Sequence, residues 1–213
     1  WTPASLSECE LMVEADSYSQ SDNTDITTSC VDYSQLARNC TITGIPTFQT
    51  NELNGLPIVR IGSASGISIN LPNLSSLTSG SMYLVIKLTN TTGDGGNLFG
   101  TSGASSHYPF NDTNVYDDFG STVRKNAGSS GITYTNWHLI NVNSRPNYWQ
   151  MIQNTTQLHS TTTNTVGFNS SPKLGQNGGG TSLQGDYYAL YLFNDQLDIS
   201  DDTKVRNYIK FRT

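Results

Sequence analysis

The carboxylates near the N-terminus come closest to a catalytic pattern. Glycoside hydrolysis needs two carboxyl groups that flank the scissile bond, about 5–5.5 Å apart in enzymes that retain the anomeric configuration. Glu14 and Asp16 stand at alternate positions, so a strand would direct both to one face. All the glutamates nevertheless lie in the first quarter of the chain, away from the strands expected to form a cleft. We therefore predict that the chain is not an enzyme.

No other nucleophile or histidine pattern is complete. A serine hydrolase would place serine at the centre of Gly-x-Ser-x-Gly, but segment 62–66 has Ala64 there. His107, His138 and His159 are too far apart in the chain to predict a metal pair. His138 follows Trp137 on an expected strand, which favours a hydrogen-bonded structural role.

Calcium is the best metal candidate, because its oxygen ligands can come from loop aspartates and carbonyls. Asp94, Asp112, Asp117 and Asp118 could supply such oxygens. The spacing of an EF-hand is missing, and turn chemistry already explains an aspartate next to glycine. We predict no metal and no cofactor.

Glycan binding is the chemistry that other side chains fit. A sugar offers a C–H face to an aromatic ring and hydroxyls to amides or carboxylates. The competing interpretation is that aromatic residues on strands belong to the core. The candidate ligand-binding residues are Asn97, His107, Tyr116, Asp117, Asn147, Tyr148 and Trp149.

The composition favours strands over helices. Of the 213 residues, 35% are hydrophobic and 13% charged, and Ser, Thr, Asn and Gly are abundant. These polar residues disfavour long helices and suit short strands joined by turns. The length fits one large all-β domain, so we expect residues 1–213 to form a single sandwich.

Alternation of apolar and polar residues places the expected elements. In segment 81–89, Met82, Leu84, Ile86 and Leu88 share one face, which we expect to lie in the core. A helical turn is expected at 33–37, and a short C-terminal helix should begin with Ser200 as N-cap. The other expected strands are 11–15, 57–61, 66–71, 121–125, 137–143, 148–153, 157–161, 165–168, 172–175 and 186–193.

Charge and cysteine content limit the partners. The net charge of −6 disfavours nucleic acid, and no apolar run is long enough to insert in a membrane. Cys30 and Cys40 are close enough in sequence for a bridge that would staple an early loop, and Cys9 could pair with either. Reduced, buried cysteines are an equal alternative.

Several segments together resemble the concanavalin A-like lectin/glucanase superfamily, in its laminin-G-like branch. The start of segment 54–61 is similar to the Asn-Gly-x-Pro-x-Val motif of these domains, and segment 185–211 is similar to their closing strand and helix. Segments 106–110, 115–124 and 137–142 resemble a variant found in bacteriophage and other viral particle proteins. Glucanase members carry Glu-x-Asp-x-x-Glu on one strand, whereas this chain has Ser19 at the third position.

The resemblance implies a jelly-roll sandwich of two antiparallel sheets. Our leading hypothesis is a non-enzymatic adhesion or decoration domain, extracellular or on a virion surface, that binds cell-surface glycans. The first alternative is a structural subunit that assembles with itself or with other particle proteins. A glycoside hydrolase with an atypical acid pair is the second. By analogy we expect a homo-oligomer, with a trimer as the specific guess.

Overall fold

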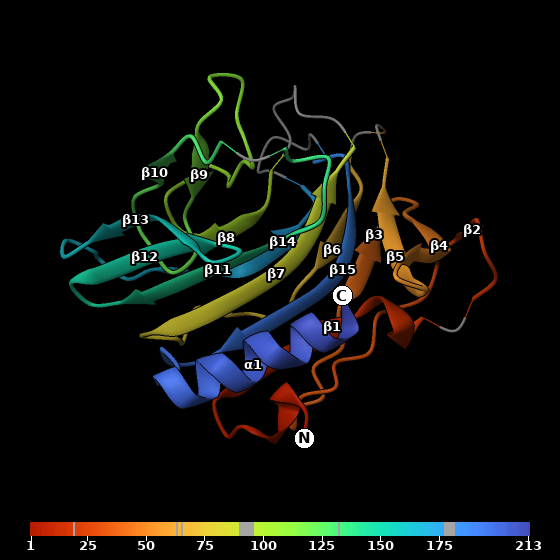
Figure 1. The fold of residues 1–213 in the computed structure, drawn as a ribbon, viewed down its shortest axis with the longest axis horizontal. Coiled ribbons are helices and arrows are strands. Elements are labelled where there is room, and N and C mark those ends of the chain that lie inside the picture. Colours follow the sequence, from red (N-terminus) through yellow and green to blue (C-terminus); the bar gives the residue numbers. More distant parts are fainter. Residues whose placement is uncertain (19, 63, 65, 90–95, 132, 177–181) are drawn as a thin grey trace.

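The computed structural model describes residues 1–213 except 19, 63, 65, 90–95, 132 and 177–181. Two antiparallel sheets stack around one core, as Figure 1 shows, so the prediction of an all-β sandwich is confirmed. Within the described residues, the larger sheet has the order β13 (Thr156–Thr161), β12 (Tyr148–Gln153), β11 (His138–Arg145), β7 (Gly80–Leu88), β15 (Gly185–Phe193), β5 (Leu56–Ile61), β4 (Thr47–Leu53) and β2 (Thr24–Asp25), with β1 (Cys9–Glu14) also paired to β15.

The smaller sheet covers the inner face of the larger one. Among the described residues it has the order β3 (Thr41–Thr43), β6 (Ser68–Asn70), β14 (Phe168–Leu174) and β8 (Leu98–Gly100). A separate pair joins β9 (Val115–Asp117) to β10 (Lys125–Gly128). Two short 3₁₀ turns, η1 (Pro3–Ser5) and η2 (Ala15–Ser17), flank β1.

The central strand β7 is buried on both faces. Met82, Leu84, Ile86 and Leu88 point into the core and are at most 1% exposed, which confirms the prediction for this segment. Tyr83 belongs to the opposite face, and it is buried too, because a helix covers that face. The larger sheet therefore has an inner face in the sandwich and an outer face that is partly covered.

One edge of β15 pairs with two strands in succession. Residues 185–187 pair with β5, and residues 189–193 pair with β1. Glu14, the last residue of β1, is thereby placed opposite Ala189 in the middle of the sheet. A carboxylate from the N-terminal segment thus lies beside the central strands.

Helix α1 (Ile199–Arg212) lies on the outer face of the larger sheet. Its N-cap is Asp198, whose side chain accepts a hydrogen bond from the Asp201 amide at 2.8 Å, so the prediction of Ser200 as N-cap is wrong by two positions. Asp201 and Asp202 stand in the first turn, where acidic residues stabilise the helix dipole. None of the helices in the described part of the chain has the length and apolar character needed to cross a membrane.

Several other segments differ from the predictions. The strand expected at 121–125 is replaced by β10, which starts at Lys125, and the helical turn expected at 33–37 is an irregular turn. The strands expected at 165–168 and 172–175 are replaced by one strand, β14, which begins at Phe168 and passes through Pro172 with an irregular register. Strand β4 was not predicted, because Thr47, Gln49 and Asn51 hide its alternation.

Candidate functional site

Helix α1 divides the outer face of the larger sheet into two flanks (Figure 1). On the flank toward β1 lies a cavity of about 410 Å³, the carboxylate cleft, lined by Thr2, Ala4, Met12, Glu14, Asp16, Tyr33 and Tyr208. On the flank toward β11 lies a cavity of about 350 Å³, the apolar groove, whose lining includes Val85, Trp137, Leu139, Asn154, Ile209 and Lys210. The position of α1 therefore shapes both cavities.

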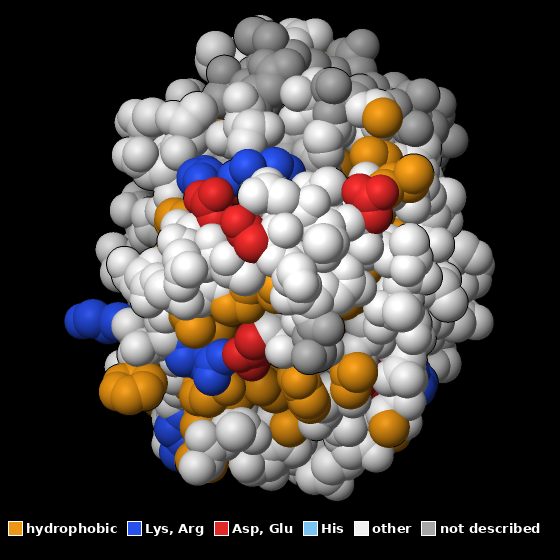
Figure 2. Space-filling view, turned by 90° about the vertical axis from the view of Figure 1, so that its right-hand side faces the viewer, with side chains coloured by type: hydrophobic (Ala, Val, Ile, Leu, Met, Phe, Trp, Pro, Cys, Tyr) orange, Lys and Arg blue, Asp and Glu red, His pale blue; other side chains and the backbone are white. Residues whose placement is uncertain are grey.

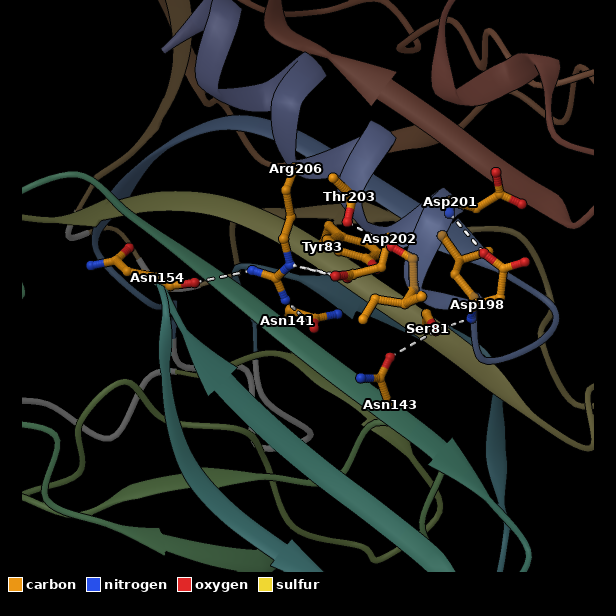
Figure 3. Close-up of polar contacts among 12 residues, drawn as sticks. Ser81, Tyr83, Asn141, Asn143, Asn154, Asp198, Asp201, Asp202, Thr203 and Arg206 are labelled. Atoms are coloured by element: carbon orange, nitrogen blue, oxygen red, sulfur yellow. Dashed lines mark hydrogen bonds and ion pairs between the residues drawn. The ribbon is translucent and has the colours of Figure 1, made fainter.

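A partly buried polar network fixes α1 on the sheet, as Figure 3 shows. The Arg206 guanidinium donates from Nε to both carboxylate oxygens of Asp202, at 3.0 and 2.9 Å. It also donates to the Asn141 side chain of β11 at 2.7 Å and to the Asn154 carbonyl at 3.0 Å. Tyr83 of β7 donates to Asp202 at 2.6 Å, and burial raises the pKa of this tyrosine, which keeps it a donor.

Glu14 forms the inner wall of the carboxylate cleft. It is 3% exposed, and its Oε1 accepts a hydrogen bond from Tyr191 of β15 at 2.6 Å. Burial raises the pKa of Glu14, and the Tyr191 hydrogen bond and the Arg212 charge oppose that shift in part. A buried carboxyl with a raised pKa is a group that can hold a proton near a ligand.

Arg212, near the C-terminal end of α1, joins the two carboxylates of the cleft. Its Nη2 lies 3.4 Å from Glu14 Oε2 and also pairs with Asp16. Its Nε donates to the Tyr188 hydroxyl at 2.5 Å. Glu14 and Asp16 therefore lie close together, as their alternate positions in the sequence suggested, although η2 turns the chain between them.

Aromatic rings surround these charges. Tyr33 is 45% exposed, and Trp1, which is 56% exposed, packs edge-on against Tyr208 with 6.3 Å between ring centroids. Burial raises the pKa of Tyr208 to about 12, so its hydroxyl stays protonated. Figure 2 shows hydrophobic side chains gathered around paired acidic and basic side chains on the face that lies at the right-hand side of Figure 1. The carboxylate cleft thus combines exposed rings with oriented polar groups.

The apolar groove has a different lining. Val85 and Leu139, opposite each other on β7 and β11, contribute apolar surface, and Ile209 of α1 adds more. Trp137 stands at one side with the Lys87 ammonium 5.2 Å from its ring centroid. Asn154 is held by its own side chain, which accepts from the Leu139 amide at 2.9 Å. The lining also includes His138, whose Nε2 has no hydrogen-bond partner among the described residues.

A row of polar side chains crosses the outer face beyond α1. Ser81 donates to Asn143 at 2.8 Å, Asn143 to Gln150 at 3.1 Å, and Gln150 to Gln157 at 2.5 Å, so four adjacent strands are linked. The Arg145 guanidinium lies over the nearby ring of Tyr148, 4.8 Å from its centroid. These side chains mainly satisfy one another.

Three predicted residues at the turn between β11 and β12 differ in exposure. Asn147 is exposed in the turn, with φ 59°, and Tyr148 is half-buried. Trp149 points into the core, is fully buried, and donates from Nε1 to the Phe119 carbonyl at 3.0 Å. Its ring is part of the packing between the sheets. A role of these three residues in ligand binding stays a prediction.

The other four predicted residues come together around β9. Isolated bridges join Asn97 to Ser106 and His107 to Tyr116. Asn97 is buried and its Oδ1 accepts from the Gly175 amide at 2.6 Å, while His107 is also buried. Only the Tyr116 ring is partly open, and the Arg124 guanidinium lies 4.4 Å from its centroid. Their contacts are mainly structural, and a role in binding stays a prediction.

Asp117, the last of the four, is fully buried. Its carboxylate accepts from the Phe119 amide at 2.6 Å and from the Tyr108 hydroxyl. Burial, together with the neighbouring Asp118 charge, raises the pKa of Asp117 to about 7. These contacts hold the turn that leads from β9 back to the core.

The calcium candidates do not converge. Asp112 is exposed, Asp117 and Asp118 are buried among hydrogen-bond donors, and Asp94 lies outside the described residues. Within the described ranges, no group of three or more His, Cys, Asp or Glu side chains is arranged to hold a metal ion.

The cleft residues Tyr33, Tyr208 and Arg212 were not predicted. Tyr33 falls in the segment where a helical turn was expected, and Tyr208 and Arg212 fall in the expected C-terminal helix. The spacing of Tyr208 and Arg212, one helical turn apart, is a signal that they share a flank of α1. That signal becomes useful only once the strand beneath the helix is known.

No protein-family model and no curated protein sequence matches the chain. Solved structures do. Domain 4 of AbnA, an extracellular arabinanase from Geobacillus stearothermophilus in complex with arabinotriose, has a TM-score of 0.66 at 15% identity, covering 93% of this chain and 98% of that one. Trypanosoma rangeli sialidase in complex with sialic acid has a TM-score of 0.65 at 10% identity, covering 96% and 33%.

Botulinum neurotoxin type C, whose cell entry depends on two ganglioside molecules, has a TM-score of 0.64 at 12% identity, covering 95% of this chain and 51% of that one. The chain thus spans about half of the toxin structure and about a third of the sialidase. At these identities the likeness shows the fold, a β-sandwich that recurs in proteins acting on or binding glycans.

The prediction that the chain is not an enzyme is wrong. Two of the similar structures come from an arabinanase and a sialidase, so this fold occurs in glycoside hydrolases. The prediction rested on the spacing of carboxylates in the sequence. Spacing is a poor guide in a sandwich, because residues from distant segments can meet on one face, as Glu14 and Arg212 do.

Proposed function

We propose that the chain binds glycans in the carboxylate cleft. The observation that carries this proposal is the placement of an exposed ring, Tyr33, beside the Glu14 and Asp16 carboxylates and the Arg212 guanidinium. A ring can contact the C–H face of a sugar, while carboxylates accept from its hydroxyls and the guanidinium donates to its oxygens. The cavity of about 410 Å³ has the size of a small oligosaccharide site.

The similar structures support the same class of ligand. The arabinanase domain was solved with arabinotriose, the sialidase with sialic acid, and the toxin depends on gangliosides. These ligands differ from one another, so the comparison supports glycans as a class and names no particular sugar. The cleft chemistry adds that hydroxyl-rich sugars fit better than strongly anionic ones, since two of its charged groups are carboxylates.

The finer assignments belong to the same proposal. We propose a concanavalin A-like domain of the laminin-G-like kind, formed by residues 1–213, that acts in adhesion or decoration outside cells or on a virion surface. The sequence resemblance and the low charged content of 13% support it. Oligomerisation would protect the outer strands β13 and β2, which end the larger sheet in the described part of the chain.

A second candidate function is glycoside hydrolysis by Glu14 and Asp16. One observation favours it: burial raises the pKa of Glu14, and Asp16 shares Arg212 with it in the same cleft. Two neighbouring carboxyls in different environments are the pattern of an acid and its partner. Release of reducing sugar from polysaccharides, abolished by Glu14→Gln, would support this function.

A glycan array probed with the wild-type protein and with Asp16→Asn tests the main proposal. We expect the wild type to bind a defined set of glycans and the variant, which loses a carboxylate but keeps the shape of the side chain, to bind them more weakly. Analytical ultracentrifugation of both proteins provides the control for assembly and folding. Self-assembly without binding to any glycan would contradict the proposal and favour the structural-subunit alternative.

A further inference from the structure

The segment between Cys30 and Cys40 forms a closed loop that presents Tyr33 to the carboxylate cleft. The Cys40 amide donates to the Cys30 carbonyl at 3.3 Å, so the two ends of the loop meet. The Tyr33 amide donates to the Met12 carbonyl of β1 at 2.8 Å, which docks the loop on the sheet. The tip of the loop is exposed, whereas both ends are buried.

Asp32 organises the interior of this loop. Its Oδ1 accepts from the amides of Met12 and Ser34, at 2.9 and 2.8 Å, and its Oδ2 accepts from the Arg38 amide at 2.8 Å. Arg38 in turn pairs with Glu10 of β1, with 2.5 Å between Nη2 and Oε2. These contacts fix the path of the chain between the two cysteines and tie it to β1, so the closeness of the two thiols is set by the surrounding fold.

The two thiols lie close to each other. Cys30 and Cys40 are both 0% exposed, a backbone hydrogen bond joins the two residues, and each thiol shifts the pKa of the other. A backbone hydrogen bond between two residues keeps their α-carbons within the separation that a disulfide spans. Cys9 is also buried, but it lies on β1 opposite Phe193 and has neither of these contacts with the pair.

We propose that Cys30 and Cys40 form a disulfide as the loop closes during folding. The oxidant is a low-molecular-weight disulfide such as oxidised glutathione. One thiolate attacks the donor disulfide and releases one molecule of reduced thiol. The second thiolate then attacks the mixed disulfide and releases the other molecule. Two cysteine thiols are thereby oxidised and one donor disulfide is reduced, with two protons passing to the released thiolates.

The two thiols differ in acidity in the folded protein. Hydrogen bonding from the Cys40 thiol lowers the pKa of Cys30, and the same hydrogen bond together with burial raises the pKa of Cys40. Because the folded protein covers both sulfurs, the exchange belongs to folding and the finished bridge is shielded from reduction.

Refolding the wild-type chain from urea in a buffer of oxidised and reduced glutathione tests the site. We expect the folded product to retain one titratable thiol after denaturation, at Cys9, and a non-reducing peptide map to join Cys30 to Cys40. The bridge should raise the Tm by about 6–10 °C over the same protein kept reduced, because it closes a short loop in the unfolded chain.

Two variants make the test specific. Cys9→Ala should form the same bridge and show the same difference in Tm between oxidised and reduced protein. Cys30→Ala, which leaves Cys9 and Cys40, should form no internal bridge and show no such difference. Three titratable thiols in the refolded wild type, or a peptide map that joins Cys9 to either partner, would overturn the assignment.

Discussion

The two flanks of α1 share one helix and one sheet but have opposite chemistry. On the β1 flank, Tyr208 and Arg212 meet carboxylates and exposed rings, whereas on the β11 flank Ile209 meets Val85 and Leu139. Successive helical residues are rotated by about 100°, so Lys210, which lines the apolar groove, lies about 200° around the helix from both Tyr208 and Arg212. A single helix therefore supplies a polar wall and an apolar wall at once, and its placement decides where a ligand can bind.

Loss of the Arg206 hydrogen bonds that hold α1 on the sheet should affect both flanks and have the largest effect on stability. Arg206→Ala removes the hydrogen bonds to Asp202, Asn141 and the Asn154 carbonyl. We expect the free energy of unfolding to fall by about 2 kcal/mol, because charged hydrogen bonds are lost and the pair is only partly screened by solvent. Urea denaturation measures it.

The matched control for Arg206→Ala is Lys204→Ala. Lys204 also pairs with an aspartate of the first turn, but its side chain is 50% exposed. We expect a change within about 0.5 kcal/mol. Equal losses in the two variants would show that α1 is not held by the Arg206 network.

The next largest effect concerns binding and separates the flanks directly. Tyr33→Ala removes the exposed ring of the carboxylate cleft, and Trp137→Ala removes the ring of the apolar groove. We expect Tyr33→Ala to weaken glycan affinity about tenfold, which corresponds to about 1.4 kcal/mol for a lost ring contact, and Trp137→Ala to leave it unchanged. Titration calorimetry with an array-selected glycan measures both, and the reverse pattern would move the binding site to the groove.

The start of α1 offers a smaller, purely structural test. Asp198→Ala removes the side chain that caps the Asp201 amide, and should lower the free energy of unfolding by about 1 kcal/mol. Ser200→Ala changes the residue that the sequence suggested as N-cap, and should have no comparable effect. If Ser200→Ala were the more destabilising variant, the helix would begin two residues later than in this structure.

Much of the fold was predictable because buried and exposed side chains alternate along a strand. The alternation around Met82 and Leu84 identified the central strand, and the run from Tyr148 to Gln153 was identified with its exact limits. Strand β4 was missed because its outward residues are polar and its inward ones include Gln49, which is 7% exposed. Pattern fails where buried positions carry amides.

The candidate site was predictable only in part. The sequence pointed to Glu14 and Asp16 as a carboxylate pair, and the structure places them together on Arg212. The sequence could not show that this arginine, almost two hundred positions later in the chain, would reach the two carboxylates. It also could not show that the Trp149 ring faces the core. Which face a strand residue occupies depends on register, and register is set by partners that lie far away in sequence.

The smallest effect that we expect is a change in how stability depends on pH, and it follows from the polar flank alone. Burial raises the pKa of Glu14, so the folded protein holds the proton of this carboxyl more tightly than the unfolded chain does. Glutamates in the unfolded chain titrate at about pH 4.3. The stability that the proton contributes is complete below about pH 4.3 and is lost as the pH rises through the pKa of the folded state.

Glu14→Gln should remove that loss, because the amide does not titrate and can still accept the Tyr191 hydrogen bond. Urea midpoints measured between about pH 4 and pH 7 should therefore decline less steeply in the variant than in the wild type. Glu52→Gln, an exposed position, should keep the slope of the wild type. Parallel curves for all three proteins would mean that Glu14 is solvated like a surface carboxylate, and the chemical distinction between the two flanks of α1 would then be smaller than the contacts suggest.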